Sequence, residues 1–380
     1  MSSVRAIAKQ LNVSAATVSR VLNNSANVDD ATRERVLECI NRLNYFPSVG
    51  RRLSNVVALA YPDEPIRTEY GSFESAMLTG IMRGLEEQQF DLKLLSIRRD
   101  KGPKETYTQF FLRKGVRGVI LRCFRQSRPM ILRIAEEGFP AIVIAEHFDE
   151  PKVNCIRAVS YASSRQAVEH LISLGHRRIV LAVHNVSDSD HADRRRAYAD
   201  ALHCAGIPVD PALIIEHPAS FSAGEQVVDA VLSMPQRATA VFATNPMTAL
   251  GIMRRAQERG VSVPRDLSVV GMDDSDIRAH VWPRMTAVCQ DATALGYEAA
   301  LWLSRTQSQR STRVERCRRE LPTTFEVNGT TSAAPGFAIG AAQQQPAQLA
   351  VEVLPVHTNG HAAQQQKTRT VRTRKSKSTE

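Results

Sequence analysis

A short stretch near the N-terminus has the residue types and the spacing of a tight turn followed by a capped helix. It comprises residues 12–20, Asn-Val-Ser-Ala-Ala-Thr-Val-Ser-Arg. Its first two residues predict a tight turn. Ser14 is a good N-cap because a serine hydroxyl accepts a hydrogen bond from a free backbone N–H at the start of a helix. The run from Ala15 then predicts a helix with Val18 and Val21 on its buried side.

A second helical pattern precedes this turn. Val4, Ile7, Ala8 and Leu11 recur at spacings of three and four residues, which predicts a helix over 4–11. Two short helices joined by a turn of this length form a helix-turn-helix, whose second helix enters the major groove with its first residues over the bases. A small amphipathic hairpin with no role in DNA binding is the alternative interpretation.

A third helix is predicted from Asp30 to Leu43, with Asp29 as its N-cap. Its apolar stripe comprises Val36, Leu37, Ile40 and Leu43. Pro47 ends the unit, because the residue before a proline is pushed out of the helical region. We therefore expect residues 1–47 to form an all-α DNA-binding domain with a small core.

Composition narrows the class of protein. The chain has 380 residues and a formal net charge of +10, which favours a polyanionic partner. Basic residues gather at both ends, in residues 1–53 and again in residues 367–380. The sequence has no apolar run of the ~20 residues that span a bilayer, and no apolar signal-peptide core. We expect no membrane partner and a cytoplasmic location, at the bacterial nucleoid.

Residues 56–327 alternate between predicted strands and helices. Strands are predicted over 56–60, 92–95, 118–121, 141–144, 178–181, 240–243 and 267–271, and helices over 74–89, 163–174 and 248–260. This alternation is typical of α/β folds with parallel sheets. The length exceeds one doubly wound domain, so we expect two Rossmann-like lobes.

The same region argues against an enzyme. It has no Gly-x-Gly-x-x-Gly after the first strand, no Walker sequence and no Gly-x-Ser-x-Gly. The six cysteines and ten histidines show no metal-ligand spacing. Asp273 and Asp274 are adjacent, so in a loop they should point apart and form no acid/base pair. We therefore expect no enzyme activity, no cofactor and no metal.

The N-terminal motifs resemble the DNA-binding domain of the LacI/GalR (lactose-repressor) family of bacterial regulators. The resemblance rests on Val13-Ser14, Thr17-Val18-Ser19-Arg20-Val21-Leu22-Asn23, Thr32-Arg33-Glu34-Arg35-Val36 and Leu43-Asn44-Tyr45-Phe46-Pro47. It implies base reading by Ala15, Ala16 and Arg20. Arginine can bind guanine through two hydrogen bonds, whereas alanine offers only methyl contacts. Ser14, Thr17, Ser19 and Asn23 are expected to bind phosphates, with capping and solvation as the alternative.

The next residues, 48–55, depart from the family pattern. Family members place a hinge helix here, with a leucine inserted in the minor groove. Leu53 would be that leucine, and Arg51 and Arg52 suit a narrow minor groove. However, Leu53 comes one residue early, and Gly50 weakens a helix by ~1 kcal/mol. Leu53 as the first core residue of the next domain is the alternative.

The α/β region resembles the periplasmic-binding-protein-like sensor domain of the same family. The resemblance rests on residues 169–179, 249–251 and 263–274. It implies a small-molecule effector between two lobes, contacted by Arg194, Asn245 and Asp273. Ligands of open α/β sheets bind beyond the carboxyl ends of strands. Glu146 ends one strand, and Tyr70 and Phe73 are candidates to stack on a ring or to pack in the core.

Several positions differ from the family pattern. The usual Asn-Asp pair reads Asn245-Pro246, and the usual Val-Asp-Asn reads Ala158-Val159-Ser160. The effector is therefore expected to differ from that of a typical family pocket, and loss of the effector stays open. Residues 328–380 are rich in Gly, Ala, Pro, Ser and Gln and predict a disordered basic tail.

These expectations combine into a homodimeric transcriptional regulator. We expect a repressor that binds a palindromic double-stranded DNA operator and responds to a small-molecule effector, a sugar or sugar derivative. One module reads few base pairs, and pairing through the sensor lobes lets two modules read a palindrome. An architectural or constitutive DNA-binding protein, whose lobes serve only dimerisation, is the alternative.

Overall fold

The computed structural model describes residues 4–22, 28–42, 55–62, 71–123, 125–185, 188–308 and 316–336. Its N-terminal helices are α1 (Val4–Leu11), α2 (Ala15–Leu22) and α3 (Asp30–Arg42). Both predicted caps are present. Ser14 Oγ accepts a hydrogen bond from the backbone N–H of Thr17 at 2.9 Å, and Asp29 Oδ1 accepts one from Thr32 at 2.8 Å. The sequence therefore predicts where these helices begin.

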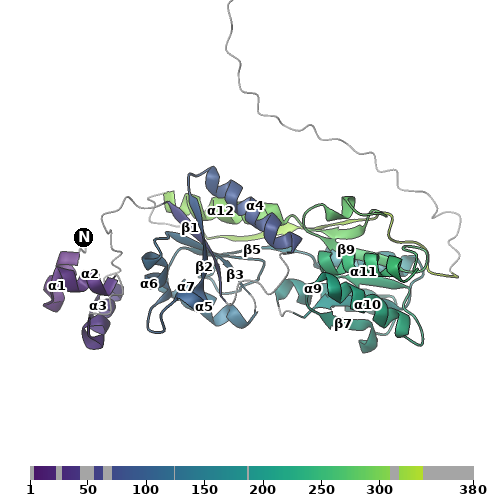
Figure 1. Ribbon diagram of the computed structural model, residues 1–380, viewed down its shortest axis with the longest axis horizontal. Coiled ribbons are helices and arrows are strands. Elements are labelled where there is room, and N and C mark those ends of the chain that lie inside the picture. Colours follow the sequence, from purple (N-terminus) through teal and green to yellow (C-terminus); the bar gives the residue numbers. More distant parts are fainter. Residues whose placement is uncertain are drawn as a thin grey trace, which may run out of the picture. The chain divides into compact units, whose positions relative to one another are not determined.

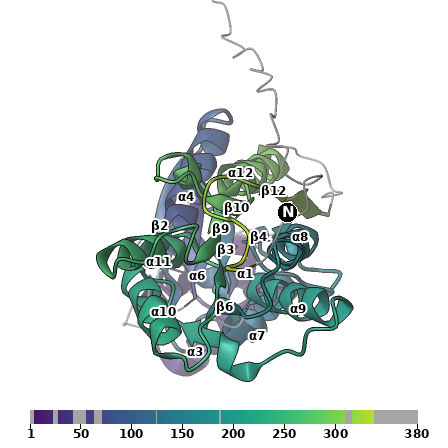
Figure 2. The same ribbon diagram turned by 90° about the vertical axis from the view of Figure 1, so that its right-hand side faces the viewer.

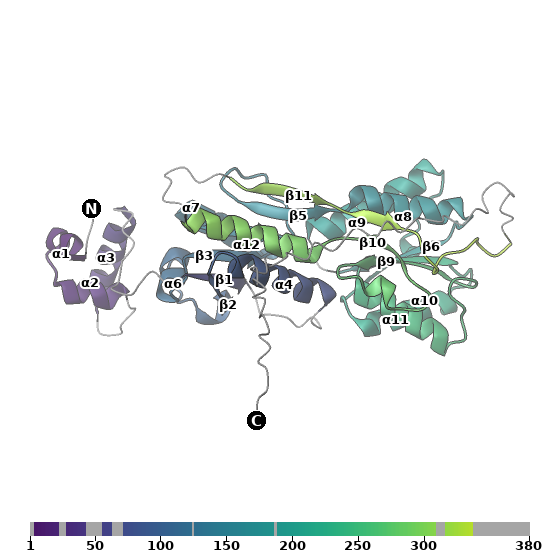
Figure 3. The same ribbon diagram turned by 90° about the horizontal axis from the view of Figure 1, so that it is seen from above.

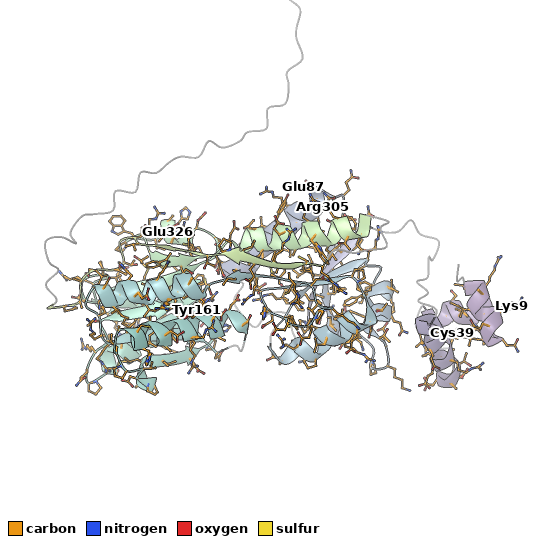
Figure 4. The ribbon with its side chains drawn as sticks, turned by 180° about the vertical axis from the view of Figure 1, so that it is seen from behind. Lys9, Cys39, Glu87, Tyr161, Arg305 and Glu326 are labelled. Carbon is orange, nitrogen blue, oxygen red and sulfur yellow. The ribbon has the colours of Figure 1, made fainter. Side chains whose placement is uncertain are left out.

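The N-terminal helices pack around a small apolar core. Its buried members are Ile7, Ala8, Val18, Val21, Val36 and Cys39. Cys39 faces the other helices, whereas Lys9 points outward from α1 (Figure 4). A core of this size leaves most of the polar side chains of the helices at the surface.

The N-terminal lobe is a parallel sheet covered on both faces. Its strands are β1 (Val56–Tyr61), β2 (Asp91–Ser96), β3 (Gly118–Arg122), β4 (Ala141–Ile144), β5 (Cys155–Val159) and β11 (Arg318–Pro322). They lie in the order β11-β5-β4-β3-β1-β2. Helices α4 (Ser72–Glu86) and α12 (Ala292–Ser308) cover one face, and α6 (Tyr107–Arg113) and α7 (Arg128–Glu137) lie on the other (Figure 1).

Alternation along β1 explains the two faces. Val57 and Leu59 belong to the cluster that includes Met77 and Leu303 of the covering helices, whereas Ala58 and Ala60 belong to the opposite cluster. Successive side chains of a strand point to opposite faces of the sheet, so a strand buried on both faces reads as a continuous apolar run. A short helix α5 (Ile97–Asp100) and the 3₁₀ turn η1 (Arg125–Ser127) complete the lobe.

The C-terminal lobe repeats this plan. Its strands are β6 (Ile179–His184), β7 (Ile214–His217), β8 (Ala240–Ala243), β9 (Ser268–Asp273), β10 (Thr286–Cys289) and β12 (Thr324–Glu326), in the order β12-β10-β9-β8-β6-β7. Only the β10–β12 pair is antiparallel among the strands described in this lobe. Helices α8 (Tyr161–Ser173) and α9 (Ser189–Cys204) flank one face, and α10 (Phe221–Ser233) and α11 (Pro246–Glu258) flank the other (Figure 2). The 3₁₀ turns are η2 (Pro211–Leu213) and η3 (Ile277–Ala279).

Within the described residues, the chain passes between the lobes at three short connections. Ser160 joins β5 to α8, Gln290 and Asp291 join β10 to α12, and Thr323 joins β11 to β12. We call Ser160, Gln290 and Thr323 the lobe junction. Thr323 Oγ1 donates to the carbonyl oxygen of Val159 at 2.9 Å, so two of these connections are bonded to each other.

All seven strands that the sequence predicts are present. The three predicted sensor helices each begin two residues earlier than expected, at Ser72, Tyr161 and Pro246. The sequence patterns do not predict β5, β7, β10, β11 or β12. The folded part also extends past Val327, because Thr330 Oγ1 donates to Val269 O at 2.6 Å and Ser268 Oγ accepts from the backbone of Ser332 at 3.1 Å. Residues 337–380 lie outside the described part of the chain.

Helices α4 and α12 lie side by side at unusually close range (Figure 3). A Cβ atom added at Gly80 would lie 1.9 Å from the carbonyl oxygen of Thr293, and one added at Gly296 would lie 2.1 Å from that of Met77. Glycine therefore permits the backbone contact on which this helix pair depends.

We predict that Gly296→Ala lowers the stability of the N-terminal lobe by about 2–3 kcal/mol, because the methyl group forces two backbones apart. Thermal unfolding of the full chain measures the change. Gly102→Ala is the matched control, since its nearest side-chain atom would lie at an ordinary 3.6 Å. Equal unfolding temperatures for the two variants would contradict the prediction.

Candidate nucleic-acid interface and ligand cavity

The predicted base-reading residues all lie on the exposed side of α2. Ala15, Ala16 and Arg20 are exposed, while Val18 and Val21 face the core. Ala16 and Arg20 are four residues apart and so share one face of the helix. These side chains therefore do not pack in the core, and they are accessible to base edges.

The predicted phosphate contacts have more varied surroundings. Ser14 and Ser19 are exposed and Thr17 is half-buried. The hydroxyls of Ser14 and Thr17 lie 2.8 Å apart, so the capping serine and its neighbour share one hydrogen bond. Asn23 and the hinge residues Arg51, Arg52 and Leu53 lie outside the described residues, and their roles stay predictions.

An open cavity lies where the two lobes meet. Counted with its solvent-filled mouth, its volume is about 720 Å³. The N-terminal lobe contributes Gly71, Phe73, Glu74 and Arg122. The C-terminal lobe and the junction contribute His184, Asp188, Asp190, His191, Arg194, Ala219, Thr244, Asn245, Pro246, Met247, Asp274 and Gln290.

The carboxyl ends of the strands supply many of these side chains. Arg122 ends β3 and His184 ends β6, and Thr244, Asp274 and Gln290 follow β8, β9 and β10. Open α/β sheets bind ligands at this edge. The parallel strands of both sheets therefore direct their carboxyl ends toward one cavity.

Arg194 is the most connected side chain of the cavity. It lies on α9 and is buried. Its Nε donates to Ser160 Oγ at 3.3 Å, and its terminal nitrogens donate to Thr244 O at 2.9 Å and to Gln290 Oε1 at 3.4 Å. A terminal nitrogen also lies 3.4 Å from His191 Nε2, and two of these four partners belong to the lobe junction. Arg194 therefore links the cavity to the connections between the lobes.

Asp273, which sequence analysis selected, lies away from the cavity. Its carboxylate accepts from Arg278 at 2.6 Å and from the backbone of Ile277 at 3.0 Å, and its side chain is buried in that loop. The next residue, Asp274, lines the cavity instead. It accepts from Gln290 Nε2 at 2.5 Å and from Ser72 Oγ, across the lobes, at 3.1 Å. The adjacent aspartates point apart, as the sequence predicts.

The other predicted effector residues divide between the cavity and its surroundings. Phe73 and Asn245 line the cavity. Asn245 also caps α11, because its Oδ1 accepts from the backbone of Met247 at 2.9 Å, and the proline that follows it suits the first helical position. Glu146 lies outside the lining. Its carboxylate accepts from the backbone of Ser189 at 3.3 Å. Tyr70 lies outside the described residues.

Several residues that line the cavity are not predicted from the sequence. Asp188, Asp190 and His191 lie in the segment that begins α9, and Arg122 and Gln290 lie at strand ends. The strand-end rule applied to every predicted strand would have pointed to Arg122, which follows the predicted strand 118–121 directly. The start of α9 carried no comparable signal, because the lengths of the surrounding loops decide which residues reach the cavity.

Burial sets the protonation of the cavity walls. It raises the pKa of Asp190 to about 7, against the opposing effect of Arg194, and it lowers the pKa of His184 to about 4. It also raises the pKa of Asp274. Burial alone would raise the pKa of Asp188 too, but the neighbouring His191 and its hydrogen bonds hold that pKa well below its usual range.

The arrangement suits binding. Carboxylates, two arginines, two amides and two histidines surround a space that the ring of Phe73 also lines, and these groups can bind hydroxyls. Within the described ranges, no group of three His, Cys, Asp or Glu side chains is placed to hold a metal ion. The described helices include none that is both long and apolar enough to cross a membrane.

Comparisons with known proteins agree with both parts of the structure. Residues 3–48 match the family of bacterial regulatory proteins called the lacI family, and residues 168–331 match the periplasmic binding protein-like domain. The HTH-type transcriptional regulator DegA of Bacillus subtilis is 28% identical over 86% of this chain and 97% of its own length. The HTH-type transcriptional repressor CytR of Escherichia coli is 30% identical over 80% of this chain and 89% of its own length.

Two solved structures are similar along most of the chain. The complex of the transcriptional regulator CelR with cellobiose has a TM-score of 0.62 at 28% identity and covers 87% of this chain and 100% of its own. A LacI family regulator from Enterococcus faecium with bound ribose has a TM-score of 0.61 at 26% identity and covers 73% of this chain and 99% of its own. With its N-terminal helix-turn-helix and its two-lobed sensor fold, the chain belongs to the LacI family of DNA-binding transcriptional regulators.

Proposed function

We propose that the chain is a repressor that binds a palindromic operator as a homodimer and releases or holds it in response to a small sugar or sugar derivative. A single helix-turn-helix module reads few base pairs, and a two-fold pair of modules reads twice as many in inverted repeat. Ala15, Ala16 and Arg20 would read base edges, and Ser14, Thr17 and Ser19 would contact phosphates.

The observation that carries effector control is the position of Arg194. Its guanidinium lines the cavity and donates to Ser160 and Gln290 of the lobe junction. A ligand that competes for this guanidinium changes the hydrogen bonds of the connections between the lobes. An effector shifts an equilibrium only by its unequal affinity for the two arrangements, and contacts at the junction provide such a difference.

The relatives support a sugar as the effector class. Cellobiose and ribose are bound in the two similar structures, and the ribose operon repressor of Haemophilus influenzae is 28% identical over 78% of this chain. The cavity offers hydroxyl-binding carboxylates and the aromatic ring of Phe73. Tyr70, which lies outside the described residues, stays a predicted ring contact.

The decisive experiment starts from the full chain. DNA selected from a random library by the purified protein defines the operator, and fluorescence anisotropy then measures operator affinity with and without each sugar of a panel. We expect an inverted-repeat operator and a sugar that changes the affinity. Tight binding of a selected operator that no effector alters would favour an architectural protein, whose lobes only dimerise.

We predict that Arg20→Ala weakens binding to the selected operator by ~1–3 kcal/mol and relaxes the preference at one base pair of each half-site, because arginine is the only long side chain at the base-reading positions. Titrations on operator and on random DNA at one salt concentration measure both effects. Equal weakening on the two DNAs would show that Arg20 contacts a phosphate instead.

We predict that Asp274→Asn lowers the affinity for the effector at least about tenfold, the order expected when a charged hydrogen-bond acceptor is lost. Operator affinity without effector should stay within about twofold. Asp273→Asn is the matched control, because it removes a carboxylate bonded to Arg278 outside the cavity. We expect that variant to unfold at a lower temperature and to keep its effector affinity. If Asp273→Asn lowers the effector affinity and Asp274→Asn does not, then Asp273 and not Asp274 contacts the effector.

A further inference from the structure

Asp190 is a buried carboxylate that faces the cavity without being satisfied. Its side chain is on α9, its exposed fraction is 6%, and it forms part of the cavity lining. Within the described part of the chain, its Oδ1 has no hydrogen-bond partner. Leaving a buried charged acceptor unpaired costs about 1–3 kcal/mol or more. Such an atom in a cavity wall indicates a ligand that supplies the missing donor.

The charges of the cavity disfavour an anionic ligand. Its lining carries the carboxylates of Glu74, Asp188, Asp190 and Asp274, against the guanidiniums of Arg122 and Arg194. Both guanidiniums have protein partners already. Arg122 is paired with Glu74 at 3.1 Å, and each nitrogen of the Arg194 guanidinium donates to a protein acceptor. An anionic ligand that bound the Arg194 guanidinium would have to displace these partners, in a lining that has more carboxylates than guanidiniums.

The helix N-termini at the cavity do not reverse this balance. Free N–H groups at the start of a helix attract anions. In α9 two of these groups are occupied, because Ser189 N–H donates to Glu146 and His191 N–H donates to Asp188. In α11 the oxygen of Asn245 accepts from the first turn. Helix α4 carries the acidic Glu74 in its own first turn.

We propose that Asp190 accepts hydrogen bonds from hydroxyl groups of the effector, and that the effector is therefore an uncharged sugar, not a sugar phosphate or a sugar acid. This inference rests on the proposed effector control of the repressor and names the chemistry of that ligand. It also assigns to one side chain the choice between neutral and anionic sugars.

Proton binding provides an independent signature of this role. Burial places the pKa of Asp190 near 7, so the carboxyl group takes up a proton just below neutral pH. Hydroxyl donors favour the ionised form, and ligand binding therefore expels that proton. The affinity should rise from pH 6 to pH 8, by up to about tenfold. The charged or titratable groups around Asp190 are Asp188, His191 and Arg194 on its own helix, and Glu74, Arg122, Glu146, Arg157 and His184 on the elements around it.

The stability of the free protein also depends on the protonation of Asp190, so this dependence can be measured without any effector. The pKa of Asp190 in the folded state is above the ordinary value near 3.9. Its contribution to stability is therefore fully present below about pH 4, is lost as the pH rises to about 7, and changes no further above that pH. Asp190→Asn removes this loss, so its unfolding temperature should rise relative to the unaltered chain between pH 5 and pH 8. Asp200→Asn, on the same helix but bonded to Tyr161, is the matched control and should show no such trend.

The ligand test uses D-ribose and cellobiose as neutral probes, and D-ribose 5-phosphate and D-gluconate as anionic probes. The full chain is titrated with each probe by calorimetry at pH 6 and pH 8. We expect binding of at least one neutral probe and of neither anionic probe. We also expect an affinity that increases with pH in the unaltered chain and in Asp200→Asn, and that is weaker and independent of pH in Asp190→Asn.

Each other outcome has a definite meaning. An anionic probe that binds and alters operator affinity would overturn the inference while leaving effector control in place. The same is true of a neutral probe whose affinity has the same pH dependence in Asp190→Asn. A flat difference in unfolding temperature between Asp190→Asn and the unaltered chain would overturn the proton-linked role of Asp190. If no probe binds, the sugar effector of the proposed function fails, and this inference fails with it.

Discussion

The hydrogen bonds of Arg194 hold together the part of the molecule where the chain passes between its lobes. A guanidinium that is removed from water needs acceptors for its N–H groups, because an unpaired buried charge is costly. Here Ser160, Gln290 and a carbonyl after β8 provide them. The same Gln290 side chain donates to Asp274, which in turn accepts from Ser72 of the other lobe. One connected set of polar groups thus spans cavity, junction and both lobes.

This set is located by the topology of the sheets. Parallel strands with helical crossovers place all their carboxyl ends at one edge, and each lobe has such an edge. The cavity lining takes Arg122 from one sheet and His184 and Asp274 from the ends of strands in the other. Polar side chains are tolerated there because they lie beyond the apolar cores and border an open cavity. The apolar runs that build the cores and the polar residues that follow them are therefore two aspects of one pattern.

That pattern explains what could be predicted from the sequence. Strands such as β1 and β8 are buried on both faces and appear as unbroken apolar runs, which made the fold class predictable. Strand β11 reads Arg-Arg-Glu-Leu-Pro and lies at the edge of its sheet, and β12 has three residues. Neither has enough apolar character to be distinguished from a loop. Pairing with β5 and β10 determines their structure, and such long-range pairing is not visible in a local pattern.

The site was harder to predict for a related reason. Asp273 and Asp274 are equivalent in sequence, and the turn after β9 decides which of them faces the cavity. Arg278 holds Asp273 in that turn, so the cavity receives Asp274. Similarly, the segment 188–191 reaches the cavity only because Glu146 and Asp188 fix the first turn of α9. Hydrogen bonds within loops therefore select the ligand-facing residue, while the strands determine only the region in which it lies.

The energies of this network are of the size that effector control requires. Coupling between a ligand site and a distant site is typically 1–3 kcal/mol, and one hydrogen bond to a charged group contributes about 1.5–3 kcal/mol. On the proposed function, exchanging one bond of Arg194 or Asp274 for a bond to the effector is enough to shift the balance between two arrangements of the lobes. The Ser72–Asp274 bond crosses directly between the lobes. An effector that takes over this acceptor therefore alters the contact between lobes without any rearrangement of either core.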